Sequence, residues 1–257
     1  MNQLHFQQKG TGPDIILIHG LFGSLDNLGL IAKALTDHYR VTSVDVRNHG
    51  DSFQLGDMDY HQTSNDVVKL MAHLQISNAH ILGHSMGGKI AMQLAVNHPD
   101  RVNKLIVADI APVQYPPHHK QIIEGLLAIE LDETSTRKSV DHKLSEYVEE
   151  QGIRQFLLRN LALNENKQLY FKCHIENIAK GYEQIMQGMA TTKQYLGETL
   201  FIKGGKSDYI KAEHADIIKN IFPNSRAKII QGAGHWLHAE KPVAFNKIVN
   251  DFLLTSD

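Results

Sequence analysis

Several features that mark particular classes of protein are missing from this sequence of 257 residues. It has one cysteine, Cys173, which excludes a disulfide bond within the chain and fits a reducing compartment. No apolar run approaches ~20 residues, the length of a membrane-spanning helix, and the first nine residues lack the apolar centre of a signal peptide. We therefore expect a cytoplasmic protein without a membrane span.

An excess of basic residues is also missing. The chain has 26 Lys and Arg against 28 Asp and Glu, a formal net charge of −2, and no long basic block. Binding to nucleic acid needs a positively charged surface, so we expect no nucleic-acid partner. Hydrophobic residues make up 42% and charged residues 21%, which is ordinary for a folded globular protein.

Apolar runs alternate with helical patterns over residues 15–109, one of them a helix expected over about 64–74, and a last helix is expected over 242–254. Such runs suit strands that are buried on both faces, and their alternation with helices predicts a parallel, doubly wound α/β sheet. An edge strand is expected before them, at residues 4–8, and two more strands after residue 198. The expected strands within and after the alternating region are 15–18, 40–44, 80–83, 104–109, 199–203 and 227–230.

The pattern Gly83-His84-Ser85-Met86-Gly87 lies between an expected strand and an expected helix. It fits G-x-S-x-G, in which a serine is held on a sharp turn with its hydroxyl exposed. Side chains two residues before and after the serine would collide with strand and helix, which explains both glycines. Ser85 also begins a helix, where unpaired N–H groups favour a developing negative charge. We take Ser85 as the candidate nucleophile.

Strand signals stop between residues 116 and 195, where four helical segments are expected instead. An insertion between two strands of a parallel sheet leaves from the end of the sheet at which ligands bind. We therefore expect an all-helical cap, residues 116–195, over a core formed by residues 1–115 and 196–257. The expected helical segments are 122–129, 140–148, 153–161 and 175–186.

A serine nucleophile needs an adjacent base, and the base needs a group that orients it. Among the 16 histidines, His235 stands out, because the glycine-rich turn Gly232-Ala233-Gly234-His235 directly follows the last expected strand. Two aspartates compete as the orienting acid. Asp109 ends the strand after the elbow helix, whereas Asp208 follows the strand at 199–203.

Four segments together resemble the α/β-hydrolase superfamily: Ile18-His19-Gly20, Asp45-Val46-Arg47-Asn48-His49-Gly50, the serine motif and Gly232-Ala233-Gly234-His235. His19-Gly20-Leu21-Phe22-Gly23-Ser24-Leu25-Asp26-Asn27 and Asp109-Ile110-Ala111-Pro112-Val113 are more closely similar to YbfF-type bacterial esterases. The resemblance implies the α/β-hydrolase fold and an oxyanion hole from the backbone N–H groups of Leu21 and Met86. It also favours Asp109 over Asp208 as the acid.

Other residues carry weaker signals. The pairs His235/His238, His118/His119 and His80/His84 do not form the two-histidine helical motif with a glutamate between, so we expect no metal and no cofactor. Trp236 and His238 are expected to line the pocket. Arg47 and His49 could contact an anionic substrate, although an Arg47 paired with a loop carboxylate is the interpretation that we favour.

These residues predict a serine carboxylic-ester hydrolase that acts through an acyl-enzyme on small to medium acyl esters or thioesters. A thioesterase or acyltransferase acting on acyl-CoA is an alternative within the same chemistry. A binding protein that uses the hydrolase fold as a ligand receptor is an alternative from another class. Sustained turnover of an ester would separate the enzyme from the receptor.

Overall fold

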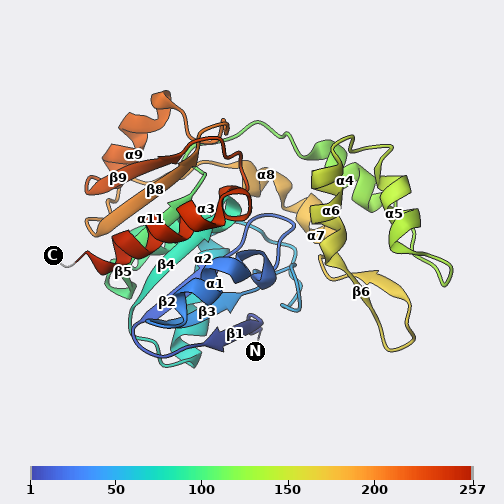
Figure 1. Cartoon of the computed structure of the whole chain (residues 1–257), viewed down its shortest axis with the longest axis horizontal. Helices are drawn as coiled ribbons and strands as arrows, with labels where there is room; N and C mark the ends of the chain where they lie inside the picture. Colours follow the sequence, from blue (N-terminus) through green and yellow to red (C-terminus); the bar gives the residue numbers. More distant parts are fainter. Residues whose placement is uncertain (1, 256–257) are drawn as a thin grey trace.

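A computed structural model describes residues 2–255. The expected core segments 1–115 and 196–257 therefore include three residues, Met1, Ser256 and Asp257, that lie outside the described residues. Within the described part, seven strands form one sheet of order β1-β3-β2-β4-β5-β8-β9 (Figure 1). The strands are β1 (Phe6–Lys9), β2 (Asp14–Ile18), β3 (Arg40–Val44), β4 (Ala79–His84), β5 (Val102–Ala108), β8 (Glu198–Gly204) and β9 (Ser225–Ile230).

Six of these strands pair in parallel, and β1 lies antiparallel to β3 at one edge. The expected α/β fold class is confirmed. Alternate residues of β2 face opposite sides of the sheet, since Ile16 and Ile18 belong to one core cluster and Ile15 and Leu17 to the other. Burial on both faces explains why the central strands are continuous apolar runs rather than alternating ones.

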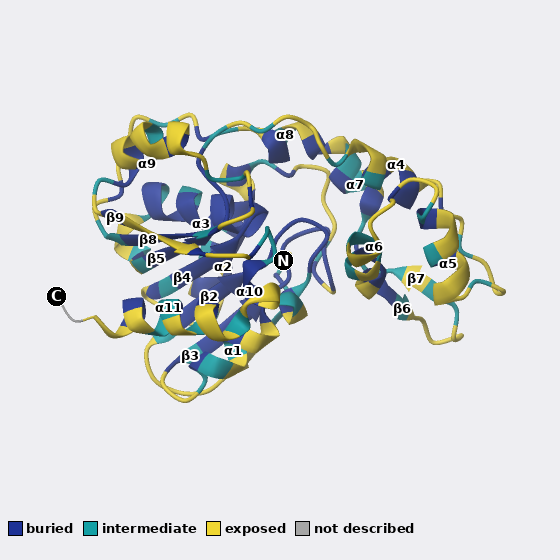
Figure 2. Ribbon diagram, turned by 45° about the horizontal axis from the view of Figure 1, so that its top comes forward, coloured by how far each residue is buried: buried dark blue, intermediate teal, exposed yellow. Residues whose placement is uncertain are grey.

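Helices cover both faces of the sheet (Figures 1 and 2). The cores on the two sides hold different helices: α1 and α11 pack on one side, and α2, α3 and α9 on the other. The helices of the core are α1 (Gly29–Leu35), α2 (Tyr60–His73), α3 (Met86–Asn97), α9 (Ala215–Ile221), α10 (Leu237–Glu240) and α11 (Pro242–Leu254), with short 3₁₀ turns at Leu25–Leu28, Pro99–Arg101 and Ala212–His214.

The chain between β5 and β8 forms a smaller lobe beside the sheet, which we call the cap (Figure 1). Its helices place apolar residues in the same core cluster as α2 and α3, so the cap packs on one side of the sheet. The helices of this lobe are α4 (Lys120–Leu127), α5 (Arg137–Leu144), α6 (Gln151–Leu157), α7 (Ile175–Lys180) and α8 (Tyr182–Met186), with a 3₁₀ turn at Leu158–Asn160.

The expectation that the cap is all-helical is wrong. Strands β6 (Leu161–Leu163) and β7 (Leu169–Phe171) pair as an antiparallel hairpin. Asn164 closes the turn, because its side chain accepts hydrogen bonds from the amides of Asn166 and Gln168 at 2.9 Å each. Each strand has only three residues, which is too short to show an alternating pattern in the sequence.

Two helix boundaries also differ from those expected. Helix α2 begins at Tyr60 rather than near Ser64, because the side chain of Asp59 caps it by accepting from the amide of Gln62 at 2.8 Å. The helix expected over 175–186 is divided at Gly181 into α7 and α8. A Cβ atom at Gly181 would lie 2.6 Å from the side chain of Met58, so the close contact with the core requires glycine there.

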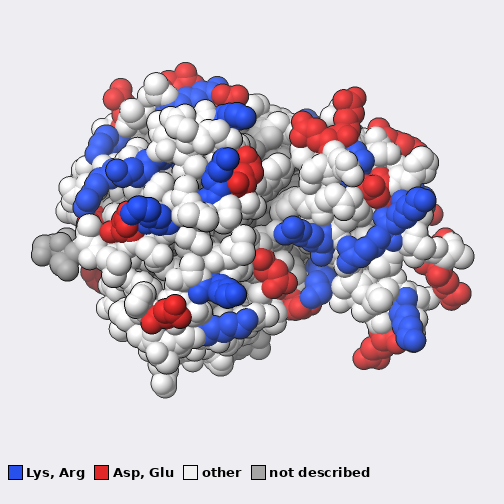
Figure 3. Space-filling view, viewed as in Figure 1, with Lys and Arg blue, Asp and Glu red and all other residues white. Residues whose placement is uncertain are grey.

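Charges of both signs are interspersed over the face of the molecule shown in Figure 3. Neither lobe gathers one sign of charge over a wide area of this face. Among residues 2–255, no helix is both long enough and apolar enough to cross a membrane.

Candidate active site

Ser85 occupies the sharp turn between β4 and α3. Its φ of 53° and ψ of −121° place it in a strained region of backbone conformation. A Cβ atom on Gly83 would lie 2.1 Å from the carbonyl oxygen of Gly87, and one on Gly87 would lie 2.2 Å from that of Ile18. The turn therefore requires glycine at both positions, and it presents Ser85 at the N-terminus of α3.

The structure brings together three of the residues singled out in the sequence. The Nε2 atom of His235 lies 2.9 Å from Ser85 Oγ, and its Nδ1 atom lies 2.7 Å from Asp109 Oδ2. These residues come from loops that follow three different strands, β4, β5 and β9. The arrangement has the geometry of nucleophile, base and orienting acid.

Asp109 is completely buried at the end of β5 and has a φ of +52°. Its Oδ1 atom accepts from the amide of Gly204 at 2.9 Å, and its Oδ2 atom accepts from the hydroxyl of Ser207. The competing Asp208 is exposed in the loop after β8, and its neighbour Ser207 is the residue of that loop that contacts the acid. Of the two aspartates that the sequence left open, Asp109 is the one in contact with His235.

Two further side chains hold His235, and the sequence analysis missed both. The ring of Tyr209 stacks on the imidazole, and the Nε2 atom of His84 donates to the backbone carbonyl of His235 at 2.8 Å. Burial keeps the pKa of His84 well below its usual value, so its ring is neutral near pH 7. His84 is the variable residue before the serine of the motif and had been considered only as part of a histidine pair, and no pattern marked Tyr209, which comes two residues after Ser207.

The loop that carries Leu21 is fixed by a buried histidine. The amide of Phe22 donates to His49 Nε2 at 3.1 Å, and His49 Nδ1 donates to the carbonyl of Arg47 at 2.9 Å. Burial lowers the pKa of His49 to about 3, which leaves Nε2 free to accept at neutral pH. A Cβ atom at Gly20 would lie 3.2 Å from that of Ser85, so this loop approaches Ser85 closely at Gly20.

Arg47 and His49 face inward rather than toward a substrate. The Nε atom of Arg47 donates to Asp66 Oδ2 at 2.6 Å, and both side chains are at most 4% exposed. The partner carboxylate lies on helix α2, whereas the sequence suggested a loop carboxylate. The pair joins the loop after β3 to α2, a structural role.

A cavity of about 230 Å³ opens beside Ser85. Core and cap both line it: Leu21, His235, Trp236 and His238 belong to the core, and His118, His119, Ile122, Ile153, Phe156 and Leu157 to the cap. The rings of Phe156 and Trp236 lie 5.6 Å apart across this junction. The cap therefore lines the pocket as expected, together with Trp236 and His238, and the lining is largely apolar.

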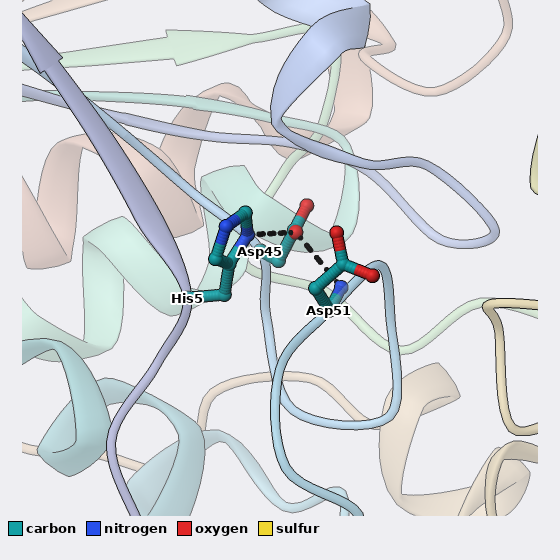
Figure 4. A group of neighbouring side chains, drawn as sticks. All are labelled: His5, Asp45 and Asp51. Carbon is teal, nitrogen blue, oxygen red and sulfur yellow. Dashed lines mark hydrogen bonds and ion pairs between the residues drawn. The ribbon is translucent and has the colours of Figure 1, made fainter. Parts of the chain in front are cut away.

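His5, Asp45 and Asp51, none of which lines this cavity, form a cluster of metal-ligand type (Figure 4). His5 Nδ1 lies 2.7 Å from Asp45 Oδ2, and Asp45 also accepts from the amides of Leu25 and Asp51. Lys172 of the cap donates to Asp51 Oδ2 at 2.7 Å. The carboxylates are thus engaged in holding loops together, and Lys172 links the cap to that junction.

Comparison with known proteins matches residues 13–242 to the family described as alpha/beta hydrolase fold. The chain is 36% identical to esterase YbfF of Escherichia coli (strain K12) over 248 residues, which cover 96% of this chain and 95% of that protein. It is 39% identical to the sn-1-specific diacylglycerol lipase ABHD11 of Mus musculus, over 95% of this chain and 81% of that one. A solved structure titled marine microorganism esterase has a TM-score of 0.95 and 40% identity, covering 98% of this chain and 100% of that chain. The resemblance seen in the sequence is confirmed.

Proposed function

Because the chain belongs to the α/β-hydrolase family, among relatives of the esterase and lipase type, we propose that it is a serine carboxylic-ester hydrolase. The proposal rests on two contacts of His235. Its Nε2 atom lies 2.9 Å from Ser85 Oγ, and its Nδ1 atom lies 2.7 Å from Asp109 Oδ2. Three residues from separate loops meet in the order that acyl transfer requires.

In the proposed reaction, Ser85 Oγ attacks the acyl carbon while His235 Nε2 takes the hydroxyl proton. The backbone N–H groups of Leu21 and Met86 stabilise the oxyanion, and Asp109 stabilises the imidazolium. His235 then gives the proton to the leaving oxygen or sulfur, which frees the alcohol or thiol and leaves the acyl group on Ser85. Water, activated by the same histidine, releases the acid and restores the serine. Each N–H donor to the oxyanion would stabilise it by about 3 kcal/mol.

The proposed substrate is a small-molecule acyl ester or thioester. The cavity beside Ser85 has a largely apolar lining, and the cap contributes about a third of its wall, so we assign residues 116–195 to substrate recognition. Residues 1–115 and 196–257 would form the core that carries out the chemistry. The residues that carry out acyl transfer would thus belong to the core, and residues of the cap would determine which substrate binds.

The test is steady-state hydrolysis of p-nitrophenyl acetate, measured as the release of p-nitrophenolate. An esterase turns over many equivalents of substrate at a constant rate. A receptor that keeps the three residues would release at most one equivalent and then stop, because its acyl-enzyme would not be hydrolysed. Such a single burst, or no release at all, would contradict the proposed function.

A further inference from the structure

Ser85 stands between two cavities of very different size. The larger one, of about 230 Å³, is lined by His235 and Trp236; the smaller one, of about 20 Å³, is lined by Met86, Ile110 and Ile185. Ser85 contributes to the walls of both, as do Leu21 and Tyr209. An ester has two arms on either side of its acyl carbon, so each arm can enter its own cavity.

The chemistry of the proposed reaction decides which arm enters which cavity. His235 must return its proton to the leaving oxygen, so the alcohol arm has to lie on the side of His235. His235 lines the larger cavity and is not part of the smaller one. Met86, in contrast, lines the smaller cavity and is not part of the larger one. The alcohol arm therefore belongs in the larger cavity, and the acyl arm in the smaller one.

Resting on the proposed function, we propose that the enzyme is selective for esters that combine a short acyl arm, such as acetyl, with a long or bulky apolar alcohol. The small cavity has about 20 Å³ of room against about 230 Å³ in the large one, so the acyl arm must be much the shorter of the two. The larger cavity, with its largely apolar lining, leaves room for a long or bulky alcohol arm.

One wall of the small cavity is tied to the core, which keeps the cavity from widening. Ile185 and Met186 form this wall. They belong to the strap Ile185–Gln187, where the chain leaves α8. Tyr60 of α2 donates to the carbonyl of Ile185 at 2.6 Å, and Lys89 of α3 donates to that of Gln187 at 2.5 Å. Lys89 is only 1% exposed.

The amine of Lys89 lies against two aromatic rings, 4.9 Å from the ring centre of Tyr115 and 5.4 Å from that of Tyr60. Burial lowers its pKa to about 7. A neutral amine still donates hydrogen bonds, so the strap stays attached on both sides of that pH. Lys89 is thus a positioning residue that fixes the length of the acyl cavity.

Two constitutional isomers test which arm of the ester must be short, because they exchange the lengths of the acyl and alcohol arms without changing the composition of the substrate. Octyl acetate has the short acyl arm, and ethyl octanoate has the long one. Since one methylene group more or less in a hydrophobic pocket changes the rate by about 10- to 200-fold, and the two acyl arms differ by six methylene groups, we expect kcat/KM for octyl acetate to exceed that for ethyl octanoate by at least about 100-fold. Both rates are measured by titration of the released acid.

Equal rates for the two isomers, or a preference for ethyl octanoate, would overturn the proposal. If neither isomer nor p-nitrophenyl acetate is hydrolysed, the proposed function fails and the inference fails with it. Rapid hydrolysis of p-nitrophenyl acetate together with equal rates for the isomers would keep the function and reject only the division of the arms.

A pair of identical substitutions tests the walls separately. Ile185→Ala enlarges the small cavity and should raise kcat/KM for ethyl butanoate at least tenfold relative to its isomer butyl acetate. Ile153→Ala makes the same change in the wall of the large cavity, and it should not raise that ratio. A rise in the ratio with Ile153→Ala but not with Ile185→Ala would reverse the assignment. The isomer preference of the unaltered protein tests the proposal even if a variant does not fold.

Discussion

The phenol ring of Tyr209 lies flat against the imidazole of His235, with the ring centres 3.9 Å apart and the planes inclined by 17°. In the proposed reaction His235 becomes a cation each time it takes the proton of Ser85. An aromatic face stabilises a nearby cation by about 0.5–2 kcal/mol. Tyr209 is therefore placed to lower the energy of the charged intermediate as well as to hold the ring.

Removing the aromatic face should slow the reaction. We expect Tyr209→Leu to reduce kcat for p-nitrophenyl acetate by about 2- to 30-fold, the equivalent of that stabilisation. Tyr209→Phe keeps the face and loses only the contact of the hydroxyl with His118, so it should restore most of the rate. If the two variants lose the same activity, the hydroxyl rather than the ring face is responsible. Circular dichroism checks that both variants fold.

Asp109→Asn should reduce kcat by about 10⁴-fold, because an amide that donates to His235 fixes the wrong tautomer of the ring. The asparagine side chain can still accept from the amide of Gly204, so the fold should persist. Asp208→Asn is the matched control, since Asp208 is exposed and it is the neighbouring Ser207 that contacts Asp109. A large loss confined to Asp208→Asn would transfer the role of acid to that residue.

A fluorophosphonate probe should label Ser85 alone. Ser85→Ala should abolish both the labelling and the hydrolysis of esters, as measured by intact mass and by release of p-nitrophenolate. Ser207→Ala offers a control, because Ser207 is also buried and lies one hydrogen bond from Asp109. That variant should still be labelled. Persistent labelling of Ser85→Ala would place the nucleophile elsewhere.

Stability should fall as the solution becomes acidic. Burial lowers the pKa of His49 and His119 to about 3 and that of His238 to about 4. Between these values and ~6.5 the unfolded chain binds protons that the folded chain excludes, so the free energy of unfolding decreases as the pH falls through this window. Each such group changes it by up to about 1.4 kcal/mol per pH unit.

Urea denaturation at pH 7, 6 and 5 measures this dependence. His49→Gln keeps an oxygen that can accept from the amide of Phe22, and it should reduce the slope of stability against pH. His73→Gln, at the exposed end of α2, should retain the slope of the unaltered protein. A slope that is the same in all three proteins would contradict the assignment of the pH dependence to buried histidines.

The parts of the fold that depend on burial were predictable from the sequence. Continuous apolar runs mark β2 and β5, and two glycines mark the turn around Ser85, because each pattern follows from a local steric or burial requirement. His235 was singled out from the glycine-rich turn that follows the last strand, and it lies in contact with Ser85. Helix α11 also begins and ends where its pattern predicts, from Pro242 to Leu254.

The rest depends on contacts between residues far apart in the chain. The choice of Asp109 depends on a left-handed turn at that residue and on donors from Gly204 and Ser207 after β8, which no local pattern reveals. Gly181, at which the expected helix divides, is in close contact with Met58, more than a hundred positions away. The small cavity likewise depends on a strap that is held by Lys89 from another element. Contacts of this kind form only when the chain folds, so local sequence patterns do not predict them.

The single cysteine can report on how the two lobes separate. Cys173 is 1% exposed, and burial raises the pKa of its thiol, so the thiol is unreactive while it is covered. Its neighbours attach the cap to the core: Lys172 binds Asp51, and the amide of His174 donates to the carbonyl of Asn48 at 2.8 Å. The rate at which a thiol reagent modifies the native protein therefore measures how often this attachment opens. Since no second cysteine contributes, the signal comes from one defined point.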